Sequence, residues 1–111
     1  MGFFSRDTID DCLKLVNKVN SEFRAILALF HSGAMYGINE SNYYSVKCHL
    51  NKIIAYSEQY DNIREHLPIT EQLDLDLMEV PLWDGVKTES FNWRFMVSQC
   101  SEQINNRLKA V

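Results

Sequence analysis

The sequence has few of the residues that interrupt regular structure, and its potential metal ligands are scattered. Only two prolines and four glycines occur among 111 residues, so long uninterrupted elements are expected. The three cysteines, Cys12, Cys48 and Cys100, are widely spaced, which argues against a disulfide framework and against a zinc site. No Gly-rich phosphate loop occurs in the sequence. We therefore expect no metal and no cofactor, and unpaired cysteines favour a reducing, cytoplasmic location.

Long apolar runs and clusters of basic residues are also missing. No window reaches the roughly 18 consecutive apolar residues that a membrane-spanning helix needs. The first residues lack the basic and apolar regions of a secretory signal. Binding to a phosphate backbone needs clustered Lys and Arg, whereas the 11 basic residues here are dispersed. We therefore expect neither a membrane segment nor direct binding to nucleic acid.

Apolar residues make up 46% of the chain and recur with helical spacing in three stretches, residues 7–32, 41–66 and 88–110. Steps of three and four place them on one face of each helix. The expected core positions are Ile9, Leu13, Val16, Val19, Phe23, Ile26 and Phe30, then Val46, Leu50, Ile53, Tyr56, Tyr60, Ile63 and Leu67, and finally Phe91, Phe95, Met96, Cys100, Ile104, Leu108 and Val111. The prediction is a single all-α domain over residues 1–111, folded as a three-helix bundle.

The net charge of −4 is concentrated in one segment. Residues 65–86 hold six acidic residues and no Lys or Arg. From Leu73 to Leu77, apolar and acidic residues alternate, which is typical of extended chain. Pro81 cannot donate to a strand ladder. The prediction for residues 68–86 is therefore a long extended acidic crossover, with a short edge hairpin or an extra helical turn near residues 70–77 as the alternatives.

The acidic crossover is the first candidate for a functional site, because it mixes negative charge with apolar side chains. Charge would steer the encounter with a basic partner, and the apolar side chains would supply contact energy. The predicted partner-binding residues are Leu73, Asp74, Asp76, Glu79, Trp83 and Asp84. The hypothesis is a non-enzymatic protein-binding module, such as a small inhibitor, immunity or adaptor protein, with no catalytic residues. A symmetric homodimer is also expected, because three amphipathic helices can leave an apolar face uncovered.

Tyrosines near the start of the second predicted helix form a second candidate site. Tyr36, Tyr43 and Tyr44 lie close in sequence to Lys47. Tyrosine rings can stack on a base, lysine can meet a phosphate, and a helix N-terminus favours anions. The alternative function from these residues is the binding of a nucleotide or another small ligand.

Arg24 and His31 give a third candidate, because six residues separate them and a helix would place both on one face. This arginine-x6-histidine spacing resembles the motif of HEPN ribonucleases, which are small helical proteins. The resemblance covers eight residues and implies RNA cleavage across a dimer interface by Arg24 and His31. The chain departs from the family pattern at Ala25, where those enzymes usually have a polar residue.

Overall fold

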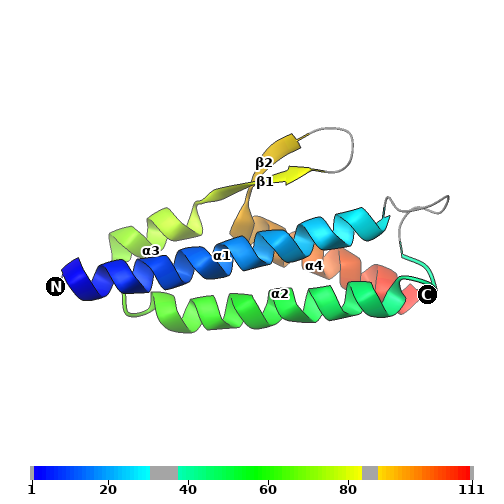
Figure 1. The fold of residues 1–111 in the computed structure, drawn as a ribbon, viewed down its shortest axis with the longest axis horizontal. Coiled ribbons are helices and arrows are strands. Elements are labelled where there is room, and N and C mark those ends of the chain that lie inside the picture. Colours follow the sequence, from blue (N-terminus) through cyan, green and yellow to red (C-terminus); the bar gives the residue numbers. More distant parts are fainter. Residues whose placement is uncertain (1, 31–37, 84–87, 111) are drawn as a thin grey trace.

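The computed structural model describes residues 2–30, 38–83 and 88–110 and shows a mostly helical chain (Figure 1). Its elements in order are α1 (Gly2–Phe30), α2 (Tyr43–Arg64), α3 (Ile69–Asp76), β1 (Glu79–Trp83), β2 (Thr88–Asn92) and α4 (Trp93–Ala110). Within these described ranges, no helix is long and apolar enough to cross a membrane.

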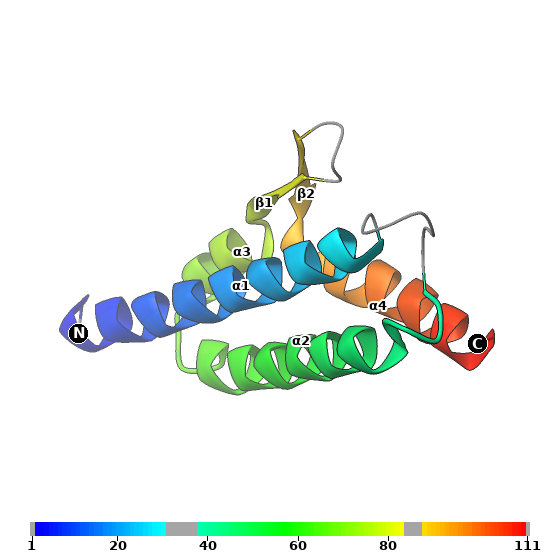
Figure 2. The same cartoon turned by 45° about the vertical axis from the view of Figure 1, so that its right-hand side comes forward.

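Helices α1 and α2 form an antiparallel pair along the long axis of a molecule that measures 53 × 27 × 18 Å (Figures 1 and 2). Between these helices, the ammonium group of Lys18 lies 5.5 Å from the centre of the Tyr56 ring. The imidazole of His49 contacts the carboxylate of Glu22. Helix α4 packs towards one end of the pair, α3 contacts α1 towards the other, and β1 contacts α1 near its middle. The two ends of the molecule are therefore built from different elements.

One apolar core joins all the helices and the first strand. Its buried members are Cys12, Leu15, Val16, Val19, Phe23, Ile26, Val46, Leu50, Ile53, Tyr60, Leu67, Leu75, Val80, Trp93, Met96, Ile104 and Leu108. These residues confirm the predicted stripes of the first two helices, because burying one face of each helix removes the most apolar surface from water.

The last helix starts later than predicted, and this changes which of its residues are buried. Residues 88–92 form strand β2, so α4 begins at Trp93 instead of at position 88. Trp93 is buried with Met96, whereas the predicted core residue Phe95 is 60% exposed. The prediction for Phe95 was wrong because the buried face of α4 is set by Trp93, which sequence periodicity did not select. The predicted core residue Val111 lies outside the described residues.

The prediction of a continuous extended crossover over residues 68–86 was also wrong. Ile69–Asp76 is helical, and the amide of Gln72 donates to the carbonyl of Pro68 at 3.1 Å. In this helix Leu75 is buried while Leu73 is exposed, so their alternation reflects helical faces. A helix pairs its backbone groups internally, whereas a lone extended segment would leave them dependent on water. The alternative of an extra helical turn is confirmed.

A two-stranded hairpin follows α3, but it lies beyond residues 70–77, and its second strand comes from the stretch predicted as the last helix. β1 and β2 are antiparallel, with Val80 opposite Phe91 and Pro81 opposite Ser90. A sheet of two strands has only edge strands, so Pro81 is tolerated in it. The side chain of Val80 is buried and packs the hairpin against the core.

Candidate functional site

A polar network fixes α3 to the rest of the molecule. The hydroxyl of Tyr60 is fully buried with its side chain and donates to Asp76 Oδ1 at 2.7 Å. Arg64 donates to both carboxylate oxygens of Asp76, from Nε at 3.1 Å and from Nη2 at 2.6 Å. Burial, and then the hydrogen bond to Asp76, raise the pKa of Tyr60, and the hydrogen bond to Asp76 raises the pKa of Arg64. Asp76 therefore has an intramolecular role that links α2 to α3.

Trp93 completes this network from the start of α4. Its indole N–H donates to the carbonyl of Leu75 at 2.7 Å, and its ring meets the Tyr60 ring edge-on with centroids 4.4 Å apart. The guanidinium of Arg94 lies 5.2 Å from the centres of both rings and pairs with Asp61 at 2.7 Å. Helices α2, α3 and α4 thus meet at one junction, which holds α3 in a defined position.

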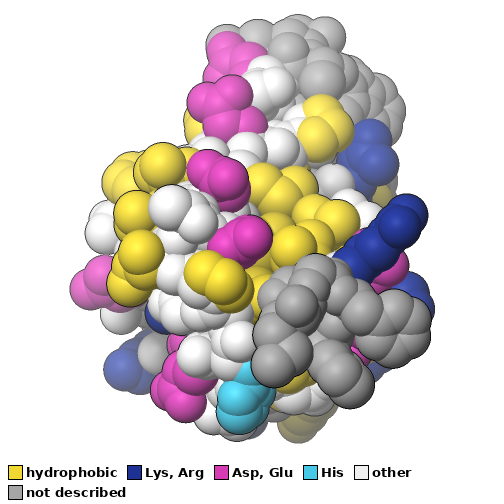
Figure 3. Space-filling view, turned by 90° about the vertical axis from the view of Figure 1, so that its left-hand side faces the viewer, with side chains coloured by type: hydrophobic (Ala, Val, Ile, Leu, Met, Phe, Trp, Pro, Cys, Tyr) yellow, Lys and Arg dark blue, Asp and Glu magenta, His cyan; other side chains and the backbone are white. Residues whose placement is uncertain are grey.

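The outer side of α3 carries three large aliphatic side chains in contact with water. Ile69 is 70% exposed, Leu73 52% and Leu77 70%, and the spacing of four places them along one side of the helix. Asp74 is exposed beside them, and Glu79 is exposed two residues beyond Leu77. We call these five residues the α3 face. Figure 3 looks at this end of the molecule and shows hydrophobic side chains gathered next to acidic ones.

The α3 face includes three of the six residues predicted to bind a partner, Leu73, Asp74 and Glu79. Asp76 lies behind it in the polar network. Trp83 ends β1, but its side chain is outside the part that the structure describes, as is the whole of Asp84. Sequence reasoning missed Ile69 and Leu77, although their spacing of four residues from Leu73 was a visible signal.

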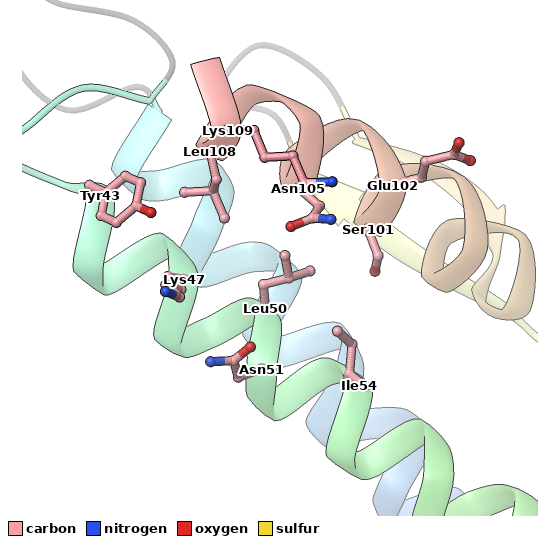
Figure 4. Close-up of a pocket in the computed structure, with 10 residues that line it drawn as sticks. All are labelled: Tyr43, Lys47, Leu50, Asn51, Ile54, Ser101, Glu102, Asn105, Leu108 and Lys109. Atoms are coloured by element: carbon pink, nitrogen blue, oxygen red, sulfur yellow. The ribbon is translucent and has the colours of Figure 1, made fainter. Parts of the chain in front are cut away.

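A groove of about 520 Å³ runs between α2 and α4 at the other end of the molecule (Figure 4). We call it the α2–α4 groove; its lining residues are Tyr43, Lys47, Leu50, Asn51, Ile54, Ser101, Glu102, Asn105, Leu108 and Lys109. Leu108 on α4 lies at the end of the groove near Tyr43, whereas Ile54 on α2 lies at the other end, opposite Ser101, with Leu50 between them (Figure 4). Lys47 and Lys109 add positive charge. The groove therefore has aliphatic residues between its helices, a lysine on each helix, and one acidic residue, Glu102, on α4.

The predicted tyrosine cluster is only partly assembled in this groove. Tyr43 and Lys47 line it, but Tyr44 does not, being 80% exposed and edge-on to Tyr43 with ring centroids 5.2 Å apart. Tyr36 lies outside the described residues. Sequence reasoning missed the contribution of α4, because the meeting of residues some 50 positions apart depends on tertiary packing.

The last two kinds of candidate site are the pair Arg24 and His31 and a metal site. Arg24 is exposed on α1, and His31 lies outside the described residues, so their pairing stays a hypothesis. Among residues 2–30, 38–83 and 88–110, no three side chains of His, Cys, Asp or Glu gather as a metal site. No protein-family model, curated protein or solved structure matches the chain.

Proposed function

We propose that this protein is a non-enzymatic protein-binding module that docks on a basic, partly apolar surface of another protein through its α3 face. The observation that carries the proposal is the exposure of Ile69 and Leu73 on α3 and of Leu77, which follows the helix directly with helical backbone angles. Covering apolar surface is favourable by about 25 cal/mol per Å². Contiguous exposed apolar patches often mark interaction sites. A role as an inhibitor, immunity or adaptor protein fits a module of this kind.

The charge around the α3 face supports a basic partner. Residues 58–79 contain seven acidic residues, and Arg64 is the single Lys or Arg among them. Arg64 is paired with Asp76, and Asp61 is paired with Arg94 of α4, so two of the seven carboxylates have a basic partner. The negative field at this end is therefore poorly compensated, and it would accelerate the approach of a positively charged surface.

The way α3 is held supports docking without a large rearrangement. The side chains of Tyr60, Arg64 and Trp93 bind the C-terminal end of α3, so its outer side is presented in one orientation. Preorganisation lowers the entropic cost of association. In this proposal α1, α2 and α4 act as a three-helix bundle that supports α3. The module acts in the cytoplasm, consistent with the free thiols of Cys12, Cys48 and Cys100.

Substitutions on the α3 face test the proposal. We expect Leu73→Asp to weaken binding to a partner at least tenfold, or about 1.4 kcal/mol, because it places a charge at the centre of the contact. Asp74→Lys should slow association and flatten its salt dependence. The measurement is to capture partners from extracts of the native host on the immobilised protein, and then to follow binding of the purified partner by surface plasmon resonance.

Two variants on the opposite part of the molecule serve as controls. Tyr44→Asp and Glu40→Lys make the same changes of polarity and charge at exposed positions near the start of α2. Both should bind as the wild type does. If a captured partner binds Leu73→Asp and Asp74→Lys with wild-type kinetics, the α3 face is not its binding site.

A further inference from the structure

The two ends of this elongated molecule carry opposite charge. The acidic α3 end is described above. At the other end, residues 40–57 hold Lys47 and Lys52 against Glu40, and residues 102–110 hold Arg107 and Lys109 against Glu102, so basic residues outnumber acidic ones four to two. The start of α2 and the end of α4 lie together at the end of the molecule away from α3 (Figures 1 and 2).

The basic end also holds the α2–α4 groove, whose shape suits a short helix. Its α2 wall runs from Tyr43 to Ile54, about 16 Å at 1.5 Å per residue. The aliphatic stripe of α3 runs from Ile69 to Leu77, about 12 Å on the same scale. An amphipathic helix that lays its apolar side into a groove is a recurrent form of recognition.

We propose that the α3 face of one copy of this chain docks in the α2–α4 groove of a second copy. The aliphatic side chains of α3 would cover Ile54, which is 43% exposed, and would lie over Leu50 and Leu108, which are nearly buried at the floor of the groove. Asp74 would face the lysines of the groove. This inference rests on the proposed function, because it uses the same α3 face and names a second copy of the chain as a partner. It also gives the α2–α4 groove a role as the binding site for α3. The aliphatic residues of the groove suit the aliphatic side of α3, and Lys47 and Lys109 suit its acidic residues.

The proposed contact joins two different surfaces, so variants of the two surfaces can be told apart by mixing them. Each copy supplies an α3 face and a groove. A variant with a damaged α3 face still offers an intact groove, and a variant with a damaged groove still offers an intact α3 face. The two variants should therefore fail to associate alone and should associate when mixed.

The experiment is sedimentation velocity of the full chain from about 5 to 500 μM, at low and at high salt. The wild type should form species heavier than the 13.0 kDa monomer, increasingly with concentration and less at high salt. Leu73→Asp on α3 and Ile54→Asp in the groove should each sediment as monomers. An equimolar mixture of the two should regain a species of about twice the monomer mass, because one intact α3 face and one intact groove remain between them. Circular dichroism of each variant verifies that it is folded.

A charge exchange gives a second measurement that leaves the apolar contacts intact. Lys47 is exposed, so Lys47→Glu should preserve the fold while reducing self-association at least fivefold. Mixing it with Asp74→Lys should recover part of the loss, because the exchanged charges again attract.

Three outcomes would overturn the inference. They are a wild type that stays monomeric at 500 μM, a mixture that does not regain the heavier species, and self-association lost with Leu73→Asp but kept with both Ile54→Asp and Lys47→Glu. The last result would mean that α3 pairs with α3. If the wild type is monomeric but Leu73→Asp abolishes binding to a different protein, the proposed function stands without this inference; if the α3 variants change neither, both proposals fail.

Discussion

Replacing Trp93 with alanine is expected to lower the free energy of unfolding by about 3–5 kcal/mol, the largest loss we predict for one side chain of this protein. Trp93 is 1% exposed and packs against Tyr60. Its removal would leave a cavity where α2, α3 and α4 meet, and it would take the indole donor away from the carbonyl of Leu75. Small domains are stable by only about 5–15 kcal/mol, so much of the total would be lost. Urea denaturation followed by circular dichroism measures the change.

Phe95 is a matched control for this prediction. It is an aromatic residue on the same helix, two positions away, but it is 60% exposed. Phe95→Ala should change the free energy of unfolding by no more than about 0.5 kcal/mol. Equal losses for Trp93→Ala and Phe95→Ala would mean that the junction of α2, α3 and α4 does not depend on Trp93.

Replacing Asp76 with alanine is expected to cost about 1–3 kcal/mol, the second largest effect we predict. The substitution leaves the buried hydroxyl of Tyr60 without its acceptor and removes both hydrogen bonds of Arg64. The expected result is a lower denaturation midpoint and faster amide hydrogen exchange in α3, which loses its link to α2. Exchange measured by mass spectrometry locates the effect.

Asp74→Ala is the control for Asp76, because Asp74 lies two residues away and is exposed. It should leave stability within about 0.5 kcal/mol of the wild type. The loss in Asp76→Ala should also shrink when Tyr60 is already phenylalanine, since the hydrogen bond between the two residues is then absent in both backgrounds. Losses that add fully in the double variant, or that are equal for Asp74→Ala and Asp76→Ala, would contradict the role given to this network.

The long helices were predictable because their apolar stripes extend over many turns. In α1, the predicted positions Val16, Val19 and Phe23 are all buried, as the spacing requires. A helix with such a repeated pattern packs with its apolar side against the core. Local sequence therefore located α1 and α2, although α1 begins at Gly2, five residues before the predicted start.

The crossover was not predictable in the same way, because its conformation is decided by distant residues. Leu73, Leu75 and Leu77 fit a strand and a short helix equally well in sequence. Hydrogen bonds from Tyr60 and Arg64 on α2 and from Trp93 on α4 fix the end of α3, and they connect positions 12 to 18 residues apart. Short elements depend on such tertiary contacts more than on their own propensities.

The candidate site, like the fold, was predictable from the sequence only in part. The sequence located the acidic segment, and Leu73 and Asp74 are exposed on α3 as docking would require. Sequence alone did not distinguish Asp74 from Asp76, because the separation of an exposed carboxylate from a paired one depends on where Tyr60 and Arg64 lie. The α2–α4 groove depends in turn on the placement of α4 beside α2.

The most direct test of the central claim, that the α3 face contacts another polypeptide, is photo-crosslinking from position 73. A benzophenone amino acid would replace Leu73, and in a control protein it would replace Arg24, which is exposed on α1 and belongs neither to the α3 face nor to the α2–α4 groove. We predict that position 73 forms a crosslink to another chain, in the purified protein or in extract of the native host, and that position 24 does not. Mass spectrometry would identify the product as a second copy or as a different protein. Irradiation that leaves position 73 uncrosslinked under both conditions, or that crosslinks both positions equally, would contradict the claim.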